Sequence, residues 1–382
     1  MSRRIIKAAI SQLLHDTGAD KVRRNRALGP VVFAYHRVVP NFATAATHTL
    51  APMLISSQMF ERHLEWIGQR FSIVSLDEIG STLEQGKTFR DPVAAITFDD
   101  GYQDTYRYAF PILKRRGIPA AVFVVTGLVG TSHAPTHDKL YALLSQAFSR
   151  WRNPCRSLSE VLHDLKIITG SIRKARRIGS SPFEITRKLL VGLPLSEISR
   201  VVDALEDRVC PPPALIEGFR TLTWEMLAEM NSRGITIGSH TRSHILLTNE
   251  DHSTVQRELE QSRVELAKHL DIPIHHFSYP DGRFSGNSIR AVASAGYRYA
   301  YTTCRHRDLN YPLYTIPRTV LWENSCVDSR GSFSGAVMSC NLSGLFDLFS
   351  GCDQEHSLSA RGTRYVPNRQ LMGLFEWNRS GS

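Results

Sequence analysis

The sequence predicts an α/β fold, specifically a distorted (β/α)7-8 barrel that carries a largely helical insertion. Short apolar runs rich in β-branched residues alternate with segments of helical period, as in folds built from βα units. The chain has 382 residues, of which 42% are hydrophobic and 21% charged. It is therefore long enough for one large barrel with an insertion, and it is neither disordered nor collagen-like. Its longest uncharged apolar stretch, residues 118–130, is shorter than the roughly 18 residues that cross a membrane.

Eight strands and five helices are predicted in alternation along the chain. The strands are expected at residues 31–35, 72–75, 93–97, 120–125, 235–239, 277–279, 299–303 and 314–317. The main helices are expected at residues 56–70, 103–116, 223–233, 253–270 and 285–295. Gly117, Gly234 and Gly296 stand where helices are expected to end, and Thr223 is the expected N-terminal cap of its helix.

Three segments break this alternation, and they suggest how the chain is divided. Residues 1–29 are basic and amphipathic, residues 30–328 form the predicted barrel, and residues 329–382 are rich in Ser and Gly and are expected to be a peripheral tail. Within the barrel, residues 131–221 have a helical pattern and include a second basic run at 172–179. We interpret 131–221 as an insertion between strands, at the place where substrate enters.

The charge of the chain favours an anionic partner. It has 46 basic and 36 acidic residues, a net charge of +10, which suits a phospholipid surface, a nucleic acid or a phosphorylated substrate. The basic runs are not interleaved with aromatic residues, so we expect no nucleic-acid binding. Six cysteines without a CxxC pair give no sign of a thiolate metal site or a dense disulfide framework.

The N-terminal segment allows two interpretations. Apolar residues between Ile5 and Leu14 recur at helical spacing beside basic ones. Such a helix can lie in the interface of an anionic membrane, or it can pack on the protein as an ordinary short helix. Lys7, Gln12 and His15 interrupt the unbroken apolar region that a secretory signal needs. We therefore expect a cytoplasmic protein, which on the first interpretation contacts the inner face of the membrane peripherally.

The first candidate for chemistry is the segment Thr97-Phe-Asp-Asp-Gly-Tyr102. A buried strand runs directly into Asp99 and Asp100, and the carboxyl ends of parallel barrel strands are where active sites lie. Two neighbouring carboxylates in different environments can divide their roles, one holding a metal and the other acting as a base. The alternative is that Asp-Asp-Gly only makes a turn and caps the next helix.

The second candidate is Ser239-His-Thr-Arg-Ser-His244, which again follows a predicted strand. His240 and His244 are four residues apart, a spacing that suits two nitrogen ligands on one divalent ion, although such pairs also occur by chance. Two histidines and one carboxylate would leave coordination positions open, which is the catalytic arrangement rather than the structural one.

These two motifs together resemble those of the polysaccharide deacetylases, carbohydrate esterase family four. Phe277-Ser-Tyr-Pro-Asp-Gly282, Ala295-Gly-Tyr-Arg-Tyr-Ala300 and Val32-Phe-Ala-Tyr-His-Arg-Val38 resemble further motifs of that family. The resemblance covers residues 30–130 and 220–322, outside the insertion and the tail.

The resemblance implies a distorted (β/α) barrel that hydrolyses N-acetyl groups on sugars. It implies that Asp100, His240 and His244 bind a divalent metal ion and that Asp99 is the general base for the attacking water bound to that ion. The tetrahedral oxyanion would be held by the metal and by a backbone N–H, which we assign to Asp281. Zinc suits two imidazoles and a carboxylate, and Fe, Co, Ni or Mn would also fit.

The general acid is where the sequence departs from the commonest family pattern. The segment Leu313-Tyr-Thr-Ile-Pro-Arg-Thr-Val320 has no histidine at the position where many members have one. In a branch that includes the poly-N-acetylglucosamine deacetylases, the acid comes from a Tyr-His pair on the first strand. Tyr35-His36 resembles that pair, so we assign the acid to His36, with His306 as the substitute. The alternative is that His36 is a hydrogen-bonded histidine at the edge of the core.

Three residues are candidates for contacts with the substrate. Asp281 stands where the family often has an aromatic residue, so Tyr102 and Trp322 are expected to contact the sugar instead. The family pattern also places an Arg that orients the base where His275 and His276 stand here. Arg283 is the candidate replacement, or else a residue that binds substrate or solvent.

The sequence therefore predicts a metal-dependent hydrolase that removes N-acetyl groups from a polysaccharide or a lipid-linked glycan. One alternative is a deformylase or O-acetyl esterase acting on a small or lipid-linked substrate, because an ester would use the same metal-activated water. The other alternative is a non-catalytic glycan-binding barrel.

Overall fold

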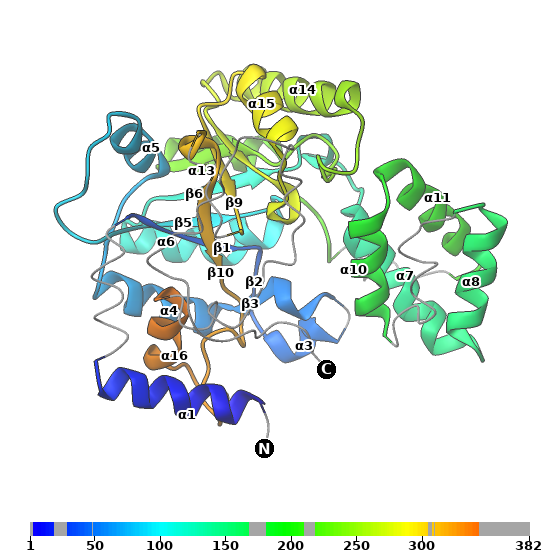
Figure 1. The fold of residues 1–382 in the computed structure, drawn as a ribbon, viewed down its shortest axis with the longest axis horizontal. Coiled ribbons are helices and arrows are strands. Elements are labelled where there is room, and N and C mark those ends of the chain that lie inside the picture. The colour runs from blue at the N-terminus through cyan, green and yellow to red at the C-terminus, as the bar shows by residue number, and fades with distance from the viewer. Residues whose placement is uncertain are drawn as a thin grey trace.

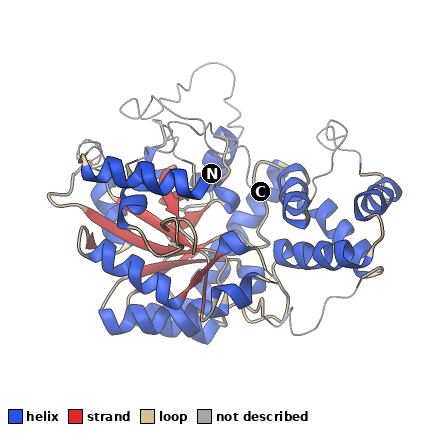
Figure 2. Cartoon of the chain, turned by 90° about the horizontal axis from the view of Figure 1, so that it is seen from below, coloured by secondary structure: helices blue, strands red, loops and turns tan. Residues whose placement is uncertain are grey.

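Seven parallel strands close into a barrel at the centre of the molecule (Figures 1 and 2). Going round the ring, each strand pairs with the next and the last pairs with the first. In that order they are β1 (Val31–Tyr35), β10 (Ile316–Val320), β9 (Tyr299–Thr302), β8 (His276–Ser278), β7 (Ile235–Ser239), β6 (Ala120–Val124) and β5 (Val93–Phe98). The computed structural model describes residues 3–18, 29–47, 49–167, 181–209, 218–304, 308 and 310–343. The predicted α/β barrel is thus confirmed, with seven strands in the closed ring.

The eighth predicted strand lies outside the ring. It is β4 (Ser72–Ile73), which pairs only with β5. Two further strands, β2 (Arg37–Val39) and β3 (Leu54–Ser56), form a small separate sheet just beyond the end of β1. Every residue of β5 and β6 is buried, as expected for parallel strands that are covered on both faces.

Helices cover the outside of the barrel (Figure 2). These are α4 (Ser57–Gly68), α5 (Leu76–Glu84), α6 (Phe110–Arg116), α13 (Trp224–Ser232), α14 (His252–Leu270) and α15 (Gly286–Ser294). The helices α4, α5, α13, α14 and α15 begin after a residue whose side chain accepts a hydrogen bond from the third backbone N–H that follows it. This capping stabilises each N-terminus by about 1 kcal/mol, and the cap of α13 is Thr223, the predicted residue.

One predicted helix begins where expected, and one predicted strand begins later. The helix expected at 103–116 does start at residue 103 and passes through a π-helical turn, Thr105–Ala109, into α6. Pro111 lacks the N–H that would bond the carbonyl of Arg107, so the regular α-helical pattern is interrupted there. The 3₁₀ turn Pro312–Tyr314 occupies the start of the strand expected at 314–317, and β10 runs over Ile316–Val320 instead.

The described part of residues 131–221 is mostly helical. It contains α7 (Thr136–Arg150), α8 (Pro154–Asp164), α10 (Pro182–Gly192) and α11 (Leu195–Glu206), drawn in green to the right of the barrel in Figure 1. These helices share a core of their own, separate from the barrel core. The basic run at 172–179 lies outside the described residues.

The first and last helices of the described part of the chain pack together beside the barrel. Helix α1 (Arg3–Asp16) packs against α16 (Gly335–Leu342), and the Sγ of Cys340 contacts the carbonyl of Ser11 at 3.8 Å. The expectation of a peripheral tail from residue 329 is therefore wrong for α16, although residues 344–382 lie outside the described part. The segment from residue 329 is rich in Ser and Gly overall, but it contains a short apolar stretch, and Ala336, Val337 and Met338 in that stretch are buried.

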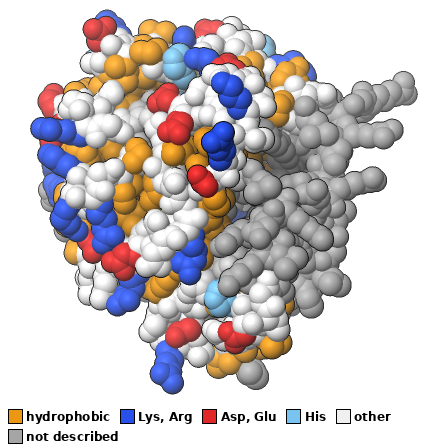
Figure 3. Space-filling model, turned by 90° about the vertical axis from the view of Figure 1, so that its left-hand side faces the viewer, with side chains coloured by type: hydrophobic (Ala, Val, Ile, Leu, Met, Phe, Trp, Pro, Cys, Tyr) orange, Lys and Arg blue, Asp and Glu red, His pale blue; other side chains and the backbone are white. Residues whose placement is uncertain are grey.

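Charged and apolar side chains alternate over the surface seen in Figure 3, which is the left-hand side of the view in Figure 1. In the described part of the chain, no helix is both long enough and apolar enough to cross a membrane.

Candidate active site

The carboxyl ends of the barrel strands bring distant residues of the chain to one rim. His36 follows β1, Asp99 and Asp100 follow β5, His240 follows β7, and Asp281 follows β8. Because all these strands are parallel and the ring is closed, their ends surround a common space, where the active sites of such barrels lie. The structure therefore brings together the two motifs that the sequence analysis singled out.

Asp100, His240 and His244 form a candidate metal site. Oδ1 of Asp100 lies 3.5 Å from Nε2 of His240 and 3.2 Å from Nε2 of His244. One potential ligand atom from each residue lies within 4.8 Å of the other two. These separations are about those expected between atoms that share one divalent ion at 2.0–2.2 Å.

The hydrogen bonding of this site fits a metal ion. Nδ1 of His240 is 2.8 Å from the backbone carbonyl of Ser278, which can only accept, so Nδ1 carries the proton and Nε2 presents its lone pair towards Asp100. Both carboxylate oxygens of Asp100 are buried and have no well-aligned donor in the described part of the protein. A buried, unpaired carboxylate is costly, and a bound cation would compensate it.

The loops of the site adopt unusual backbone conformations. In the described part of the chain, six residues other than glycine have positive φ, and four of them belong to the site. They are Asp100 (φ 68°), Thr241 (φ 67°), His244 (φ 59°) and Asp281 (φ 54°). Such conformations are unfavourable for L-residues and persist only where surrounding contacts hold them.

Asp99 faces Arg318, a residue that the sequence analysis did not select. The guanidinium group of Arg318 donates to both carboxylate oxygens of Asp99, at 2.7 and 2.6 Å, and to Oγ of Ser278 at 2.7 Å. Burial raises the pKa of Asp99, but Arg318 and the nearby histidines lower it further, so that the pKa lies below its ordinary value. Asp99 is therefore ionised at neutral pH, as a general base must be.

Arg318, and not Arg283, is the arginine that contacts the Asp99 carboxylate. Nε of Arg283 donates instead to the Asp281 carboxylate at 3.0 Å. His276, one of the histidines that stand where the family pattern has an arginine, is buried and bonded to Asp77 and Tyr301. The signal that could have revealed Arg318 is its place directly after the strand expected at 314–317, where a buried charged residue would need a partner.

His36 lies at the same rim, half-buried, and its Nδ1 is buried without a hydrogen-bond partner in the described structure. Burial raises the pKa of Asp100, but His244, His137 and His36 lower it further, so that the pKa lies well below its ordinary value. The contribution of His36 indicates that this histidine is close to the candidate metal site. His306, the substitute acid, lies outside the described residues.

The proposed sugar contacts have different surroundings. Trp322 is half-buried just after β10. Tyr102 is fully buried, so its ring offers no surface to a sugar, and its expected role as a direct contact is wrong. The neighbouring insertion covers it, because the backbone of Tyr102 forms a β-bridge with Thr221.

Tyr102 connects the site to two further residues that the sequence analysis missed. Its hydroxyl donates to Oδ2 of Asp138 at 2.5 Å, and Nε2 of His137 lies 2.7 Å from the same hydroxyl. Because the phenol has only one proton, His137 must be the donor in the second bond. His137 also lies 3.9 Å from Oδ2 of Asp100. The first turn of α7 thus brings insertion residues to the candidate metal site.

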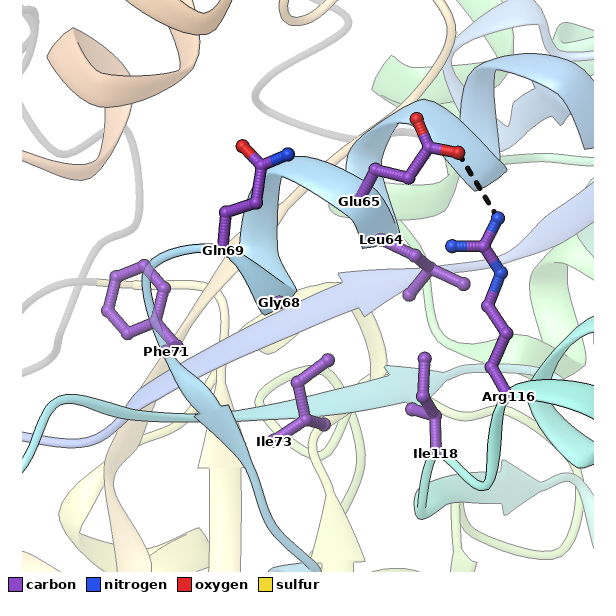
Figure 4. A pocket seen from close by; sticks show the side chains of 8 residues that line it. All are labelled: Leu64, Glu65, Gly68, Gln69, Phe71, Ile73, Arg116 and Ile118. Atoms are coloured by element: carbon purple, nitrogen blue, oxygen red, sulfur yellow. Dashed lines mark hydrogen bonds and ion pairs between the residues drawn. The ribbon is translucent and has the colours of Figure 1, made fainter.

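A surface hollow of about 550 Å³ lies elsewhere (Figure 4). Its lining includes Phe71 and Ile73 at the start of β4, and Ile118 and Arg116 just before β6. The hollow is therefore at the amino ends of the strands, opposite the site.

Comparison with known proteins is consistent with this geometry. Residues 86–165 and 195–300 match the polysaccharide deacetylase family. Over 128 residues the chain is 31% identical to the poly-beta-1,6-N-acetyl-D-glucosamine N-deacetylase of Staphylococcus aureus strain MSSA476, covering 31% of this chain and 43% of that protein. The chain thus spans less than half the length of this curated relative.

Two solved structures have a similar fold. The Streptococcus pyogenes deacetylase PplD, in complex with acetate, superposes with a TM-score of 0.51 at 17% identity, covering 82% of this chain and 97% of that one. IcaB from Ammonifex degensii gives a TM-score of 0.50 at 18% identity, with the same coverage. The closed parallel barrel is therefore the fold of these deacetylases. By this match over nearly half of its length, and by its fold, the chain is similar to the polysaccharide deacetylases.

Proposed function

We propose that this chain removes N-acetyl groups from an N-acetylglucosamine-containing glycan. The observation that carries the proposal is the division of labour between adjacent carboxylates. Asp99 is ionised and held by Arg318, whereas Asp100 faces two imidazole nitrogens. Two carboxylates with such different partners are suited to different roles in one hydrolytic reaction. The similarity to the Staphylococcus aureus N-deacetylase makes a β-1,6-linked N-acetylglucosamine oligomer the first substrate to test.

In the proposed mechanism, Asp100, His240 and His244 hold one divalent ion, with zinc as the first choice and Fe, Co, Ni or Mn as the others. When bound, the ion supplies Lewis acidity to the acetamide carbonyl and to water. Asp99 accepts the proton of the attacking water, because its carboxylate is ionised at neutral pH. The backbone N–H of Asp281 donates to the developing oxyanion. His36 gives a proton to the departing amine, so that acetate and a free amino sugar are formed.

The first experiment measures metal content by elemental analysis in the wild type and in His240→Ala. We expect about one divalent ion per chain in the wild type and a large loss in the variant, because one of three ligands is gone. The exposed histidine His252 provides the control, and His252→Ala should keep the metal. Acetate release from the oligomer should follow the metal content. A wild type that binds no metal after incubation with zinc would refute the hydrolytic mechanism and favour a glycan-binding barrel.

We further propose that α1 attaches the protein to an anionic membrane. Ser11 faces α16 and is buried, while on the outer side of the helix Ile5, Ile10 and Leu13 are 38%, 41% and 63% exposed. Seven basic residues and two acidic ones lie among residues 1–28. An apolar helix face near an excess of positive charge is suited to an interface of anionic lipids. A lipid-linked glycan would then be brought close to the enzyme.

Sedimentation with vesicles tests this attachment. The wild type should sediment with phosphatidylglycerol vesicles at low salt, and much less with phosphatidylcholine vesicles or at high salt. Leu13→Glu should abolish sedimentation. Val264 on α14 is exposed to a similar extent, 58%, so Val264→Glu is the matched control and should sediment like the wild type. If the wild type stays in solution, or if both variants behave alike, α1 is not the attachment surface.

A further inference from the structure

The loop that carries the two metal-site histidines needs support from outside itself. His240 and His244 are separated by three residues, and both Thr241 and His244 have positive φ. A backbone bent in this way at residues other than glycine costs on the order of 1–2 kcal/mol at each position. The loop follows β7 without entering a helix, so regular secondary structure does not hold it. Hydrogen bonds from a neighbouring element must fix the separation of the two imidazoles.

The backbone N–H groups of Thr126 and Gly127 donate to the carbonyls of Thr241 and Arg242. Glu258 on α14 accepts from N–H groups of the same loop. Its Oε2 accepts from the backbone N–H of Arg242 at 2.9 Å and from that of Ser243 at 2.8 Å. Both donors lie between the two histidines. The Glu258 side chain is buried, with 8% of the residue exposed. A carboxylate at such a position is retained only when hydrogen bonds compensate for its lost hydration, and bonds to a charged acceptor are about twice as strong as neutral ones.

The same helix holds the beginning of the loop through a second contact. Oγ of Ser239 accepts from the backbone N–H of Thr241 at 3.2 Å and is itself hydrogen-bonded to Oγ of Ser262 at 2.8 Å. Ser262 lies one turn along α14 from Glu258. The loop is therefore hydrogen-bonded to α14 at two positions one helical turn apart, Glu258 and Ser262. Glu258 is the charged one of the two.

We propose that Glu258 is a positioning residue for the metal site, which sets the separation and orientation of His240 and His244. This inference rests on the proposed function, since it assumes that these histidines bind a divalent ion. Glu258 itself does not touch the ion or the substrate. Residues that orient metal ligands in this way typically change metal affinity by 10–100-fold when they are removed.

Glu265 provides a matched control on the same helix. It lies two turns from Glu258 and also contacts the loop region, but through side chains, since it accepts from Nε of Arg242 at 2.8 Å and from Oγ1 of Thr126 at 2.5 Å. Its side chain is 30% exposed. If any carboxylate near the loop were sufficient, Glu265 and Glu258 would have equal effects. If the backbone contacts matter, only Glu258 would affect the metal.

The experiment measures the affinity of the full-length protein for Co²⁺ and Zn²⁺ by competition with a chromophoric chelator, for the wild type, Glu258→Ala, Glu258→Gln and Glu265→Gln. The visible absorption of the Co²⁺-loaded proteins reports the geometry of the ligands. Thermal unfolding of the metal-free proteins reports whether each variant is folded. Glu258→Gln keeps the shape and an accepting oxygen, so it remains informative if Glu258→Ala does not fold.

We expect metal affinity to fall by about 10–100-fold in Glu258→Ala, with an altered Co²⁺ spectrum. A smaller fall is expected in Glu258→Gln, because its neutral oxygen accepts more weakly. Glu265→Gln should match the wild type in affinity and spectrum. If the wild type binds metal and Glu258→Ala and Glu258→Gln bind it equally well with the same spectrum, the positioning role is refuted while the proposed function stands. If the wild type itself binds no metal, the proposed function fails and this inference fails with it.

Discussion

The buried pair of Arg318 and Asp99 should control the acid side of the pH–activity profile. Both side chains are almost fully buried, and two hydrogen bonds of 2.6 and 2.7 Å join them. Two unit charges about 4 Å apart interact with about 4 kcal/mol at an effective dielectric constant near 20. Burial alone would raise the pKa of Asp99, and the arginine is the main charge that lowers it. Without Arg318 the pKa of Asp99 must rise.

Two substitutions separate charge from geometry. In Arg318→Met the acid limb of the kcat/KM profile should move to higher pH by roughly one unit or more, since about a third of that interaction already corresponds to one pKa unit, 1.36 kcal/mol. The free energy of unfolding near pH 7 should also fall by about 3–5 kcal/mol, because one buried charge loses its partner. In Arg318→Lys the positive charge remains, but the pair of hydrogen bonds to Asp99 is lost. The acid limb of the pH profile should therefore move less than in Arg318→Met, while kcat/KM still falls.

The assay is acetate release from an N-acetylglucosamine oligomer from about pH 2 to pH 9, with urea unfolding measured in parallel over the same range so that it includes the pKa of Asp99 in both states. In the wild type the stabilisation from this pair is present above the pKa of an aspartate in the unfolded chain, about 4. It is lost as the pH falls through the lower pKa of the folded state. Arg318→Met should lack this dependence. An acid limb at the same pH in the wild type and in Arg318→Met would refute the assignment of Asp99 as the base that Arg318 controls.

Three further predictions concern the acid, a loop glycine and a buried histidine. His36→Ala should lower the rate of amide hydrolysis by about 10²–10⁴-fold. The rate for an activated acetate ester should be nearly unchanged, because its leaving group needs no proton from an acid. Equal losses for both substrates would exclude His36 as the acid. In Gly282→Ala the new Cβ would lie 2.0 Å from Oγ1 of Thr303 at φ +66°, so thermal unfolding should show a far larger loss than Gly234→Ala, where φ is +84° and no atom lies within 4 Å. Burial lowers the pKa of His63 to about 3. Below about pH 6.5 the unfolded chain therefore binds a proton that the folded chain does not. The free energy of unfolding then falls by up to about 1.4 kcal/mol for each pH unit. In His63→Gln, urea unfolding between pH 4 and 6.5 should show a weaker pH dependence; an unchanged slope would mean that His63 does not stay neutral.

The fold was predictable because each barrel strand has a local signal. In β5 and β6 all the residues are buried, so the sequence there is continuously apolar, and glycines or capping residues mark where neighbouring helices begin and end. Closure of the ring through the pairing of β1 with β5 is a long-range contact that no local pattern contains. The same limit applies to α16, whose apolar residues are buried through contacts with α1 and with the barrel core, both distant in the sequence.

The candidate site was predictable where its residues are close together in the sequence. Asp99 and Asp100 are adjacent, and His240 and His244 are four residues apart, so each motif can be recognised without the fold. Arg318 is 219 residues from Asp99, and no local pattern around an isolated arginine just after an expected strand identifies its partner. Residues such as Glu258 and His137 are similar, because each acquires its role only when its helix is packed against the rim.

The backbone at Asp100 explains how two adjacent aspartates can serve different partners. Neighbouring residues of an extended strand point to opposite faces, so a straight continuation of β5 would direct only one of the two carboxylates into the site. At Asp100 the chain takes a φ of 68°, a left-handed conformation that carries a cost for this residue. With this turn, Asp99 meets Arg318 and Asp100 meets His240 and His244 in the same space. The carboxylate of Asp99 is therefore paired with the guanidinium of Arg318. The carboxylate of Asp100 has no such cationic partner among the described residues, and we propose that it binds a metal ion. The left-handed turn at Asp100 is the structural basis for separating the proposed base from the proposed metal ligand.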